Sequence, residues 1–473
     1  MSKAEARAEY FRARAVWPHE DVSAESRLRA FEQMRRLPVY APLAKGSAVG
    51  DWTNVGPDNI GGRIFALALN PLNPSTMYVG AADGGVWRSW DGGLSWTSVS
   101  DDFPTQSMGS IVINPIDTSI VYAGTGDASF GGYSFAGAGM FKSTDSGESW
   151  TQVGAATLPL ARISEMVINP LNPDILYVAI PYGLADETIN GIWRSKDGGL
   201  TWEHVLPSRT TDIVINPLDP DILYTVSSKV LGGYTAARYG VFKTADGGDN
   251  WTKLDIGVTD SLIGRTGIGI CASQPDVLYL GVSELAGGER TPLMGIFKTT
   301  DAGANWTKLS VPFDYMVSQG WFDNIIGVDP TDPDIVFAGG VKLIRSGDGG
   351  DTWERIADQL AGGILHVDQH EIEFDPTNPD RVYVGNDGGL YLITDQGKTL
   401  EKRDIGLSIT QFIGGDMYPG NDAFLFGGTQ DNGTLISSAQ PGFQLSLYGD
   451  GGHGYIHPSS PNVIYTTQER LKL

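Results

Sequence analysis

Short runs of alternating apolar and polar residues recur along most of the chain, each bounded by proline, asparagine, aspartate or glycine. RIFALALNP (63–71) is one run, and MYVGAAD (77–83), GVWRSWD (85–91) and WTSVSD (96–101) follow it directly. Alternation with a period of two is the pattern of strands that bury one face, and the residues between the runs favour tight turns. The pattern therefore predicts short antiparallel strands in sets of four.

One phrase marks the predicted turn between the third and fourth strand of each set. It is intact in six copies, from SWDGGLSW (89–96) to SGDGGDTW (346–353), and worn in a seventh, ITDQGKTL (393–400). Its aspartate can accept hydrogen bonds from N–H groups of the same turn, so we expect a structural role. The seven aspartates are Asp91, Asp145, Asp197, Asp246, Asp301, Asp348 and Asp395, spaced 47 to 55 residues apart.

A period near 50 residues is the size of one four-stranded propeller blade. A second phrase, such as NPLNPSTMYVG (70–80), occurs nine times and indicates about nine repeat units. The predicted fold is all-β, a multi-bladed β-propeller of four-stranded blades over residues 48–473. We expect DWTNVGP (51–57) to complete the last unit as its fourth strand and so close the ring, with truncation of a longer chain as the alternative.

Residues 1–47 do not fit the repeat and form a short N-terminal helical extension in this interpretation. Within SAESRLRAFEQMRRLP (23–38), Leu28, Phe31, Met34 and Leu37 lie along one helical face, with Ser23 as the expected N-cap. We expect this helix to dock on the outside of the propeller, and a partner-binding helix is the alternative.

Composition and charge limit the partners. The chain has 62 glycines, 12 tryptophans and only 19% charged residues, which is typical of a turn-rich β protein. A net charge of −23 repels nucleic acid and anionic membranes. The single cysteine, Cys271, excludes an internal disulfide framework and a cysteine-rich zinc site. No apolar run is long enough to insert into a membrane, and the first 18 residues show no secretory signal.

The repeated aspartate phrases resemble the Asp-box, or BNR, repeats of bacterial sialidases, xyloglucanases and sortilin-type propellers, over about residues 51–467. The whole chain is similar to bacterial BNR-repeat proteins that are labelled glycosyl hydrolases. That resemblance implies a secreted or cell-surface protein, whereas the chain itself shows no signal peptide and leaves a cytoplasmic location open. The substrate-binding arginine of sialidases resembles Arg63 in RIF (63–65). Aligning the xyloglucanase Asp-Ile-Gly-Gly on Gly84-Gly85 places Ala82 at the aspartate, with Asp83 one residue later.

The topology of a blade predicts where a site lies. The central mouth should be built from the starts of the first strands and the ends of the second strands. These positions are arginine-rich in units one, three and four and rich in carboxylates in units seven to nine, although a solvated rim of random charges is the alternative. Candidate catalytic acids and bases are Asp368, Asp387, Asp431 and Asp450. Candidate substrate-binding residues are Arg63, Arg162, Arg209, Asp83 and Trp321.

HVDQHEIEFDP (366–376) raises the possibility of a metal site. On an extended strand His366, Asp368 and His370 would share one face, and imidazole and carboxylate suit a divalent ion such as zinc or manganese. The alternative is that these side chains hydrogen-bond neighbouring strands. No cofactor is certain from the sequence.

Two functions remain open from the sequence. The first is a carbohydrate-directed propeller, glycoside hydrolase-like or glycan-binding, whose partner is a glycan or polysaccharide. The second is a non-catalytic scaffold of the sortilin kind that binds a peptide or protein. Aromatic platforms such as Tyr133 and Trp321 beside the carboxylates favour sugar, whereas a wide tunnel lined by apolar residues favours peptide.

Overall fold

The computed structural model describes residues 24–36, 54–128, 135–181, 187–228, 239–285, 291–356, 359–360, 363–421, 423–438 and 442–468. Helix α2 (Ala24–Arg36) and the short 3-10 helices η1 (Glu187–Ile189) and η2 (Asp260–Leu262) are the helices among them, and the other elements are strands. No helix in these ranges is long and apolar enough to cross a membrane.

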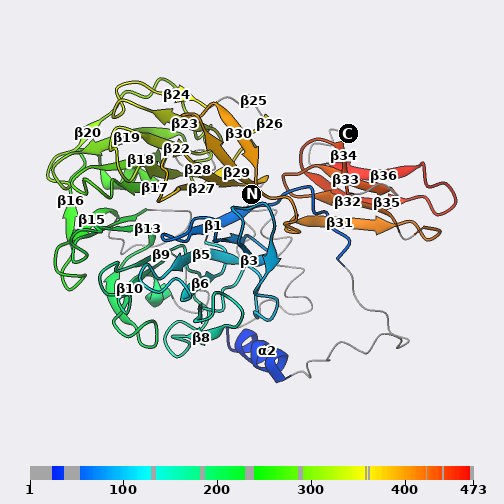
Figure 1. The fold of residues 1–473 in the computed structure, drawn as a ribbon, viewed down its shortest axis with the longest axis horizontal. Helices are drawn as coiled ribbons and strands as arrows, with labels where there is room; N and C mark the ends of the chain where they lie inside the picture. Colours follow the sequence, from blue (N-terminus) through cyan, green and yellow to red (C-terminus); the bar gives the residue numbers. More distant parts are fainter. Residues whose placement is uncertain are drawn as a thin grey trace.

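Seven antiparallel four-stranded sheets follow one another as blades (Figure 1). The first four are β1 (Ile64–Leu69), β2 (Met77–Ala81), β3 (Gly85–Ser89) and β4 (Thr97–Ser98); β5 (Met108–Ile113), β6 (Val121–Thr125), β7 (Met140–Ser143) and β8 (Thr151–Val153); β9 (Glu165–Ile168), β10 (Leu176–Ile180), β11 (Gly191–Ser195) and β12 (Glu203–Pro207); and β13 (Thr210–Ile215), β14 (Leu223–Ser227), β15 (Gly240–Thr244) and β16 (Thr252–Leu254). In every blade the four strands pair in chain order, as the alternating pattern predicts.

The remaining three blades complete a closed ring. They are β17 (Ile263–Ile270), β18 (Leu278–Glu284), β19 (Leu293–Thr299) and β20 (Thr307–Lys308); β21 (Ile325–Val328), β22 (Val336–Gly339), β23 (Leu343–Ser346) and β24 (Glu354–Arg355); and β27 (Gln369–Phe374), β28 (Val382–Asn386), β29 (Gly389–Thr394) and β30 (Thr399–Lys402). A small hairpin, β25 (Gln359–Leu360) and β26 (Gly363–Ile364), precedes the last blade. Strand β1 packs against both β5 and β27, so the ring closes after seven blades.

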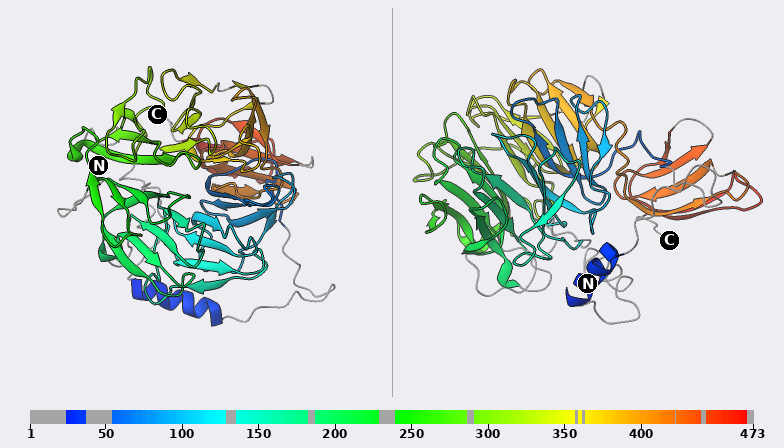
Figure 2. Two further views of the ribbon diagram at one scale, coloured as in Figure 1. Left: turned by 60° about the vertical axis from the view of Figure 1, so that its left-hand side comes forward. Right: turned by 60° about the horizontal axis from the view of Figure 1, so that its bottom comes forward.

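The eighth and ninth repeat units lie outside the ring, to its right in Figure 1 and again beside it in Figure 2. They are β31 (Phe412–Met417), β32 (Phe424–Thr429), β33 (Thr434–Ser438) and β34 (Gln444–Leu447), and the pair β35 (Gly451–Ile456) and β36 (Ile464–Gln468). Strands β31 and β32 both pack against β35. We call β31–β36 the outer group. The prediction of an all-β, multi-bladed propeller with about nine repeat units is confirmed.

The expectation of a single ring closed by an N-terminal strand is wrong. Blade seven already has its own fourth strand, β30, and residues 54–57 form no strand, while 51–53 lie outside the described residues. The ring closes instead by the kind of tryptophan contact that joins blades one and two. The indole Nε1 of Trp150 in blade two donates to the carbonyl of Val99 in blade one at 2.7 Å, and Trp96 in blade one donates to Arg403 after blade seven at 2.8 Å.

The repeated aspartates lie in the turns between third and fourth strands. In the first copy Asp91 Oδ1 accepts the Ser95 N–H at 2.9 Å and Oδ2 accepts the Ser95 hydroxyl at 2.6 Å. These hydrogen bonds lower the pKa of Asp91 to about 2. Gly92 and Gly93 have φ of 75° and 84°, a left-handed conformation that glycine adopts without strain. Each of five further carboxylates accepts the backbone N–H and a side-chain donor of the residue four positions later, a hydroxyl at Asp145, Asp197 and Asp348 and an asparagine amide at Asp246 and Asp301.

A tyrosine on the second strand of five blades ties each blade to the turn of the next. The hydroxyl groups of Tyr78, Tyr122, Tyr177, Tyr224 and Tyr279 donate to turn carbonyls of Ser146, Gly198, Gly247, Ala302 and Gly349, respectively. In blade six the equivalent residue is Phe337, and the following turn is the worn seventh copy. The turns therefore hold neighbouring blades together.

Removing one of these hydroxyl groups should destabilise the ring. Tyr177 is 2% exposed and its hydroxyl lies 2.8 Å from the Gly247 carbonyl. We expect Tyr177→Phe to lower the free energy of unfolding by about 1 kcal/mol, the usual net contribution of a buried hydrogen bond. Thermal denaturation measures the change, and Tyr455→Phe, on a half-exposed tyrosine of β35, is the control. Equal midpoints for the two variants would contradict this role.

The inner strands shape the axis of the ring. In five blades the pairing of the first two strands shifts register near the start of the inner strand, which is the signature of a β-bulge. A bulge redirects one side chain, and the residues inside the shifts include Phe65, Gly109, Thr211, Arg265 and His370, all of which line the axial cavity.

Helix α2 contacts the outer part of the ring. Phe31 packs against the core cluster between blades one and two, which contains Val86, Met108 and Phe141. Met34 is 38% exposed, so the apolar face covers less than the sequence predicts, and Leu37 and Ser23 lie outside the described residues. The boundary between 1–47 and 48–473 stays a prediction.

Candidate functional site

The mouth of the ring is formed where the inner strands begin and the second strands end, on the side that faces the outer group. Arg63 precedes β1 and Asp83 follows β2, Asp387 follows β28, and Asp431 follows β32 of the outer group. The sequence suggested that units eight and nine form an arc of the ring, and this expectation is wrong. They bring Asp431 and Asp450 to the mouth from outside it.

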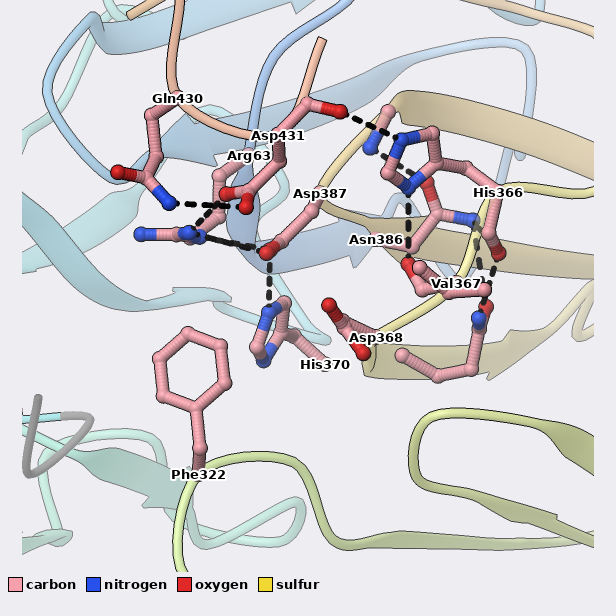
Figure 3. A network of polar contacts seen from close by, with 12 residues as sticks. Arg63, Phe322, His366, Val367, Asp368, His370, Asn386, Asp387, Gln430 and Asp431 are labelled. Atoms are coloured by element: carbon pink, nitrogen blue, oxygen red, sulfur yellow. Dashed lines mark hydrogen bonds and ion pairs between the residues drawn. The ribbon is translucent and has the colours of Figure 1, made fainter. Parts of the chain in front are cut away.

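Arg63 lies at the centre of this group of residues (Figure 3). Its Nε lies 2.6 Å from Asp387 Oδ1 and its Nη2 lies 2.9 Å from Asp387 Oδ2, while Nη2 also contacts Asp431 Oδ2. Its guanidinium stands over the ring of Phe322 at 5.0 Å. The side chain is 10% exposed. Arg63 was predicted to bind substrate, but here it binds two carboxylates of the protein.

Asp387 is a charged, enclosed carboxylate. Its side chain is 1% exposed and also lies 2.6 Å from His370 Nε2. Burial alone would raise the pKa of Asp387, but Arg63 and His370 outweigh burial and hold the pKa well below its ordinary value. A carboxylate with so low a proton affinity and so little exposure is poorly suited to exchange protons with a substrate.

Asp431 has the opposite properties. Burial and the negative charge of Asp387 raise the pKa of Asp431 well above its usual range, against the smaller opposing effect of Arg63. Gln430 Nε2 donates to Asp431 Oδ1 at 2.8 Å. The side chain is 18% exposed, and its backbone has φ of 62°, which an aspartate adopts only when its surroundings hold it there. Asp431 is therefore a partly exposed carboxyl group whose protonated form is favoured by burial and by Asp387.

Asp83 stands on the ring side of the same mouth. Its Oδ2 accepts a hydrogen bond from Gln411 Nε2, on the segment leading to β31, at 2.6 Å. Burial by the walls of the mouth and the neighbouring charge of Asp127 raise the pKa of Asp83, although the side chain remains exposed at the rim. The alignment with xyloglucanases places Ala82 at their aspartate and Asp83 one residue later, and the sequence predicted Asp83 as a substrate-binding residue.

Asp323 is a mouth residue that sequence reasoning missed. It is fully buried, no hydrogen-bond donor reaches its carboxylate oxygens, and it lies against Asp368, with which it can bond only through a shared proton. Burial and Asp368 raise its pKa well above the ordinary value. Asp368 accepts from Gln319 Nε2 at 3.3 Å. Nothing in SQGWFDN (318–324) marks Asp323 apart from its place before an inner strand.

The premise of the metal hypothesis is wrong. Strand β27 begins at Gln369, and Asp368 has φ of 65°, so His366, Asp368 and His370 do not alternate along one strand. The ring nitrogens of His366 contact the carbonyl oxygens of Val367 and Asp431, and His370 contacts Asp387. In the part of the chain that the structure describes, no three His, Cys, Asp or Glu side chains are placed to hold a metal ion.

The other predicted residues lie around this centre. Arg162 precedes β9 and donates to the carbonyl of Phe135 at 3.0 Å, and Arg209 precedes β13 and is 7% exposed. Trp321 is half-buried and stands 5.4 Å from Phe322, whose ring packs edge-on against His370. The carboxylate of Asp450 accepts the Asp431 N–H at 3.2 Å. Tyr133 lies outside the described residues.

Beneath the mouth the axis holds a narrow polar cavity of about 50 Å³, room for a few water molecules. Its lining includes the acids Glu165, Asp212 and Glu371, with Arg265 as the cation. Burial is the largest cause of a raised pKa for each acid, about 8 for Glu165 and about 6 for Asp212. This is not the wide apolar tunnel that would favour a peptide.

The fold and the site together define a β-propeller that gathers carboxyl groups at its mouth, Asp387 and Asp431 among them. Comparison with known proteins finds that the chain is similar to xyloglucanases over part of their length. The chain is 27% identical over 302 residues to a xyloglucanase of Paenibacillus sp., covering 57% of the chain and 28% of that protein. It is 26% identical over 162 residues to the oligoxyloglucan-reducing end-specific xyloglucanase of Emericella nidulans, covering 32% of the chain and 20% of that protein.

Solved structures show the same fold. The GH74 xyloglucanase of Xanthomonas campestris matches with a TM-score of 0.68 at 16% identity, over 89% of this chain and 65% of that one. The GH74 enzyme of Niastella koreensis matches with a TM-score of 0.65 at 18% identity, over 88% and 65%. No protein-family model matches the chain. The chain thus spans under a third of the length of these curated relatives, and the fold is shared with glycoside hydrolases.

Proposed function

We propose that this protein is a glycoside hydrolase that cleaves a polysaccharide of the xyloglucan class at the mouth between the ring and the outer group. The observation that supports the proposal is a pair of carboxyl groups with raised pKa on the two sides of one mouth, Asp83 from the ring and Asp431 from the outer group. Glycoside hydrolysis uses two such groups flanking the scissile bond.

The two carboxyl groups have different roles in this proposal. Asp431 is the general acid, because burial and Asp387 raise its pKa and 18% of its side chain stays exposed. Asp83 is the partner that activates water or attacks the sugar, after losing its proton at the exposed rim. Trp321 provides an apolar platform for a sugar ring beside Phe322.

A polysaccharide substrate also implies that the protein works outside the cell or on its surface, which fractionation of the producing cells would test. The alternative of a peptide-binding scaffold is less well supported, because the mouth is lined by acids and the axial cavity is narrow and polar.

A substrate panel tests the proposed function. We expect the full chain to release reducing ends from xyloglucan faster than from an unbranched β-glucan, and to release none from an α-glucan. Trp321→Ala is expected to raise KM about tenfold while changing kcat little, since it removes binding surface remote from the reacting bond. Absence of release from every glycan in the panel would contradict hydrolysis.

A further inference from the structure

The buried carboxylate of Asp387 lies at the centre of the hydrogen bonds that form the mouth, yet it is too enclosed to contact a substrate. It receives two hydrogen bonds from Arg63 and one from His370, and its side chain is 1% exposed. Its backbone carbonyl accepts from Asn432 Nδ2 at 2.9 Å, which ties it to the loop that carries Asp431. Its contacts therefore act on Asp431 rather than on a ligand.

Arg63 divides its charge unequally between the two carboxylates. Asp387 binds it with both oxygens, whereas Asp431 touches Nη2 with one (Figure 3). A bidentate pair of this kind is the stronger interaction and neutralises most of the guanidinium charge. Asp431 consequently gains less from the arginine charge than it loses by the negative charge of Asp387, and its acid proton can bond to Asp387.

We propose that Asp387 is a positioning residue that keeps Asp431 in its protonated form, by holding the charge of Arg63 and by accepting the hydrogen bond of the Asp431 carboxylic acid. This inference rests on the proposed function, in which Asp431 is the general acid.

The neighbours of Asp431 support this assignment. Arg63 faces it from the start of β1, Asp387 from the turn after β28 and Asp450 from the segment before β35. The His366 ring contacts the Asp431 backbone carbonyl at 3.2 Å. Asp387 is the member of this set that both repels a negative Asp431 and occupies the arginine.

His370 holds Asp387 without adding charge. Its ring is enclosed edge-on by Phe65 at 4.7 Å and Phe322 at 4.9 Å. Burial lowers the pKa of His370 in spite of Asp387, which favours the neutral imidazole, and Nε2 lies 2.6 Å from Asp387 Oδ1, which as a carboxylate oxygen accepts. The orientation of Asp387 is thereby fixed from both sides, by Arg63 and by His370.

The first test is the pH dependence of hydrolysis. In Asp387→Asn the amide cannot neutralise Arg63, so Arg63 pairs with Asp431 and favours its ionised form. We expect the basic limb of the pH profile of kcat to move about one to three pH units to lower pH, with activity on the acid side within threefold of wild type. An unchanged limb would overturn the proposal. So would a loss at every pH as large as that of Asp431→Asn, because Asp387 would then take part in the chemistry itself.

The second test does not need activity. The carboxyl ¹³C signal of Asp431, assigned by its absence in Asp431→Asn, is titrated in wild type and in Asp387→Asn, where we expect the midpoint to fall by at least one pH unit. Asp450→Asn is the matched control, because it removes a negative neighbour and leaves Arg63 paired. An equal fall of the Asp431 midpoint in both variants would show that the loss of a negative neighbour alone explains the shift. That result would overturn the role of Arg63. A titration that shifts as expected in a protein without hydrolytic activity would uphold this inference and reject the proposed function.

A charge-balanced variant covers the case in which Asp387→Asn fails to fold. Arg63→Gln/Asp387→Asn removes both members of the buried pair, so neither charge is left without a partner. In this double variant the titration midpoint of the Asp431 carboxyl group should lie within about one pH unit of the wild-type midpoint. It should also lie above the midpoint expected where Arg63 has lost Asp387 as its partner. A midpoint as low as the ordinary aspartate value would contradict the proposal.

Discussion

Asp431→Asn is expected to lower kcat for xyloglucan hydrolysis by about 10²- to 10⁴-fold, the usual contribution of a positioned general acid. The amide keeps the size of the side chain and can still accept a hydrogen bond from Arg63, whose partner Asp387 remains in place. It has no proton to give to the leaving group. KM should change little, because the variant removes an interaction made mainly in the transition state.

The matched variant is Asp83→Asn, on the opposite side of the mouth. A loss of similar size is expected, and the double variant should lose little more than either single one, because the two groups act as a unit. Initial rates of reducing-end release provide the measurement. Retention of more than a tenth of wild-type kcat in Asp431→Asn would contradict its role as the acid.

The stability of the fold should be highest in mild acid and fall as the pH rises. Four acids on the inner strands, Glu165, Asp212, Glu371 and Glu373, have folded-state pKa values raised by burial, about 7 for Glu373. Because they hold protons in the folded protein that the unfolded chain releases near pH 4, their contribution is complete below pH 4 and is lost as the pH rises through about 6 to 8. For each of these acids the free energy of unfolding falls by about 1.4 kcal/mol per pH unit between its unfolded-state and folded-state pKa values.

Thermal denaturation between pH 5 and pH 9 measures this effect. We expect the midpoint to fall by about 5 to 10 °C over that range. Glu371→Gln should raise the midpoint much more at pH 8 than at pH 5, since the amide cannot ionise against Glu165 and Asp212 in the axial cavity. The exposed Asp102→Asn is the control. A midpoint that rises between pH 6 and pH 8 would contradict the assignment of protons to these acids.

The blades were predictable because each carries its own local signal. The turn at Asp91 is specified by residues within eight positions, and tyrosines such as Tyr177 recur at a fixed place in the second strand. The closure of the ring was not predictable, because it depends on Trp96 reaching Arg403, a contact between residues 307 positions apart. The same repeated sequence pattern continues through units eight and nine, and only the packing of their strands shows that they lie outside the ring.

The kinds of residue at the site were predictable from the sequence, but the pairs that they form were not. The sequence placed Arg63, Asp387 and Asp431 at a mouth, yet it treated Arg63 as a substrate ligand and Asp387 as catalytic. The structure pairs them because a buried guanidinium requires a carboxylate partner. The motif at His366 to His370 misled for a local reason: the left-handed backbone at Asp368 breaks the alternation that the metal hypothesis assumed.

The most direct test of the account is a crystal structure of Asp431→Asn with a bound xyloglucan oligosaccharide. We predict that the sugar chain lies across the mouth between the ring and the outer group, with the scissile oxygen about 3 Å from the side chain of residue 431 and a sugar ring against Trp321. An oligosaccharide bound elsewhere, or none bound at saturating concentration, would contradict the claim that this mouth is the hydrolytic site.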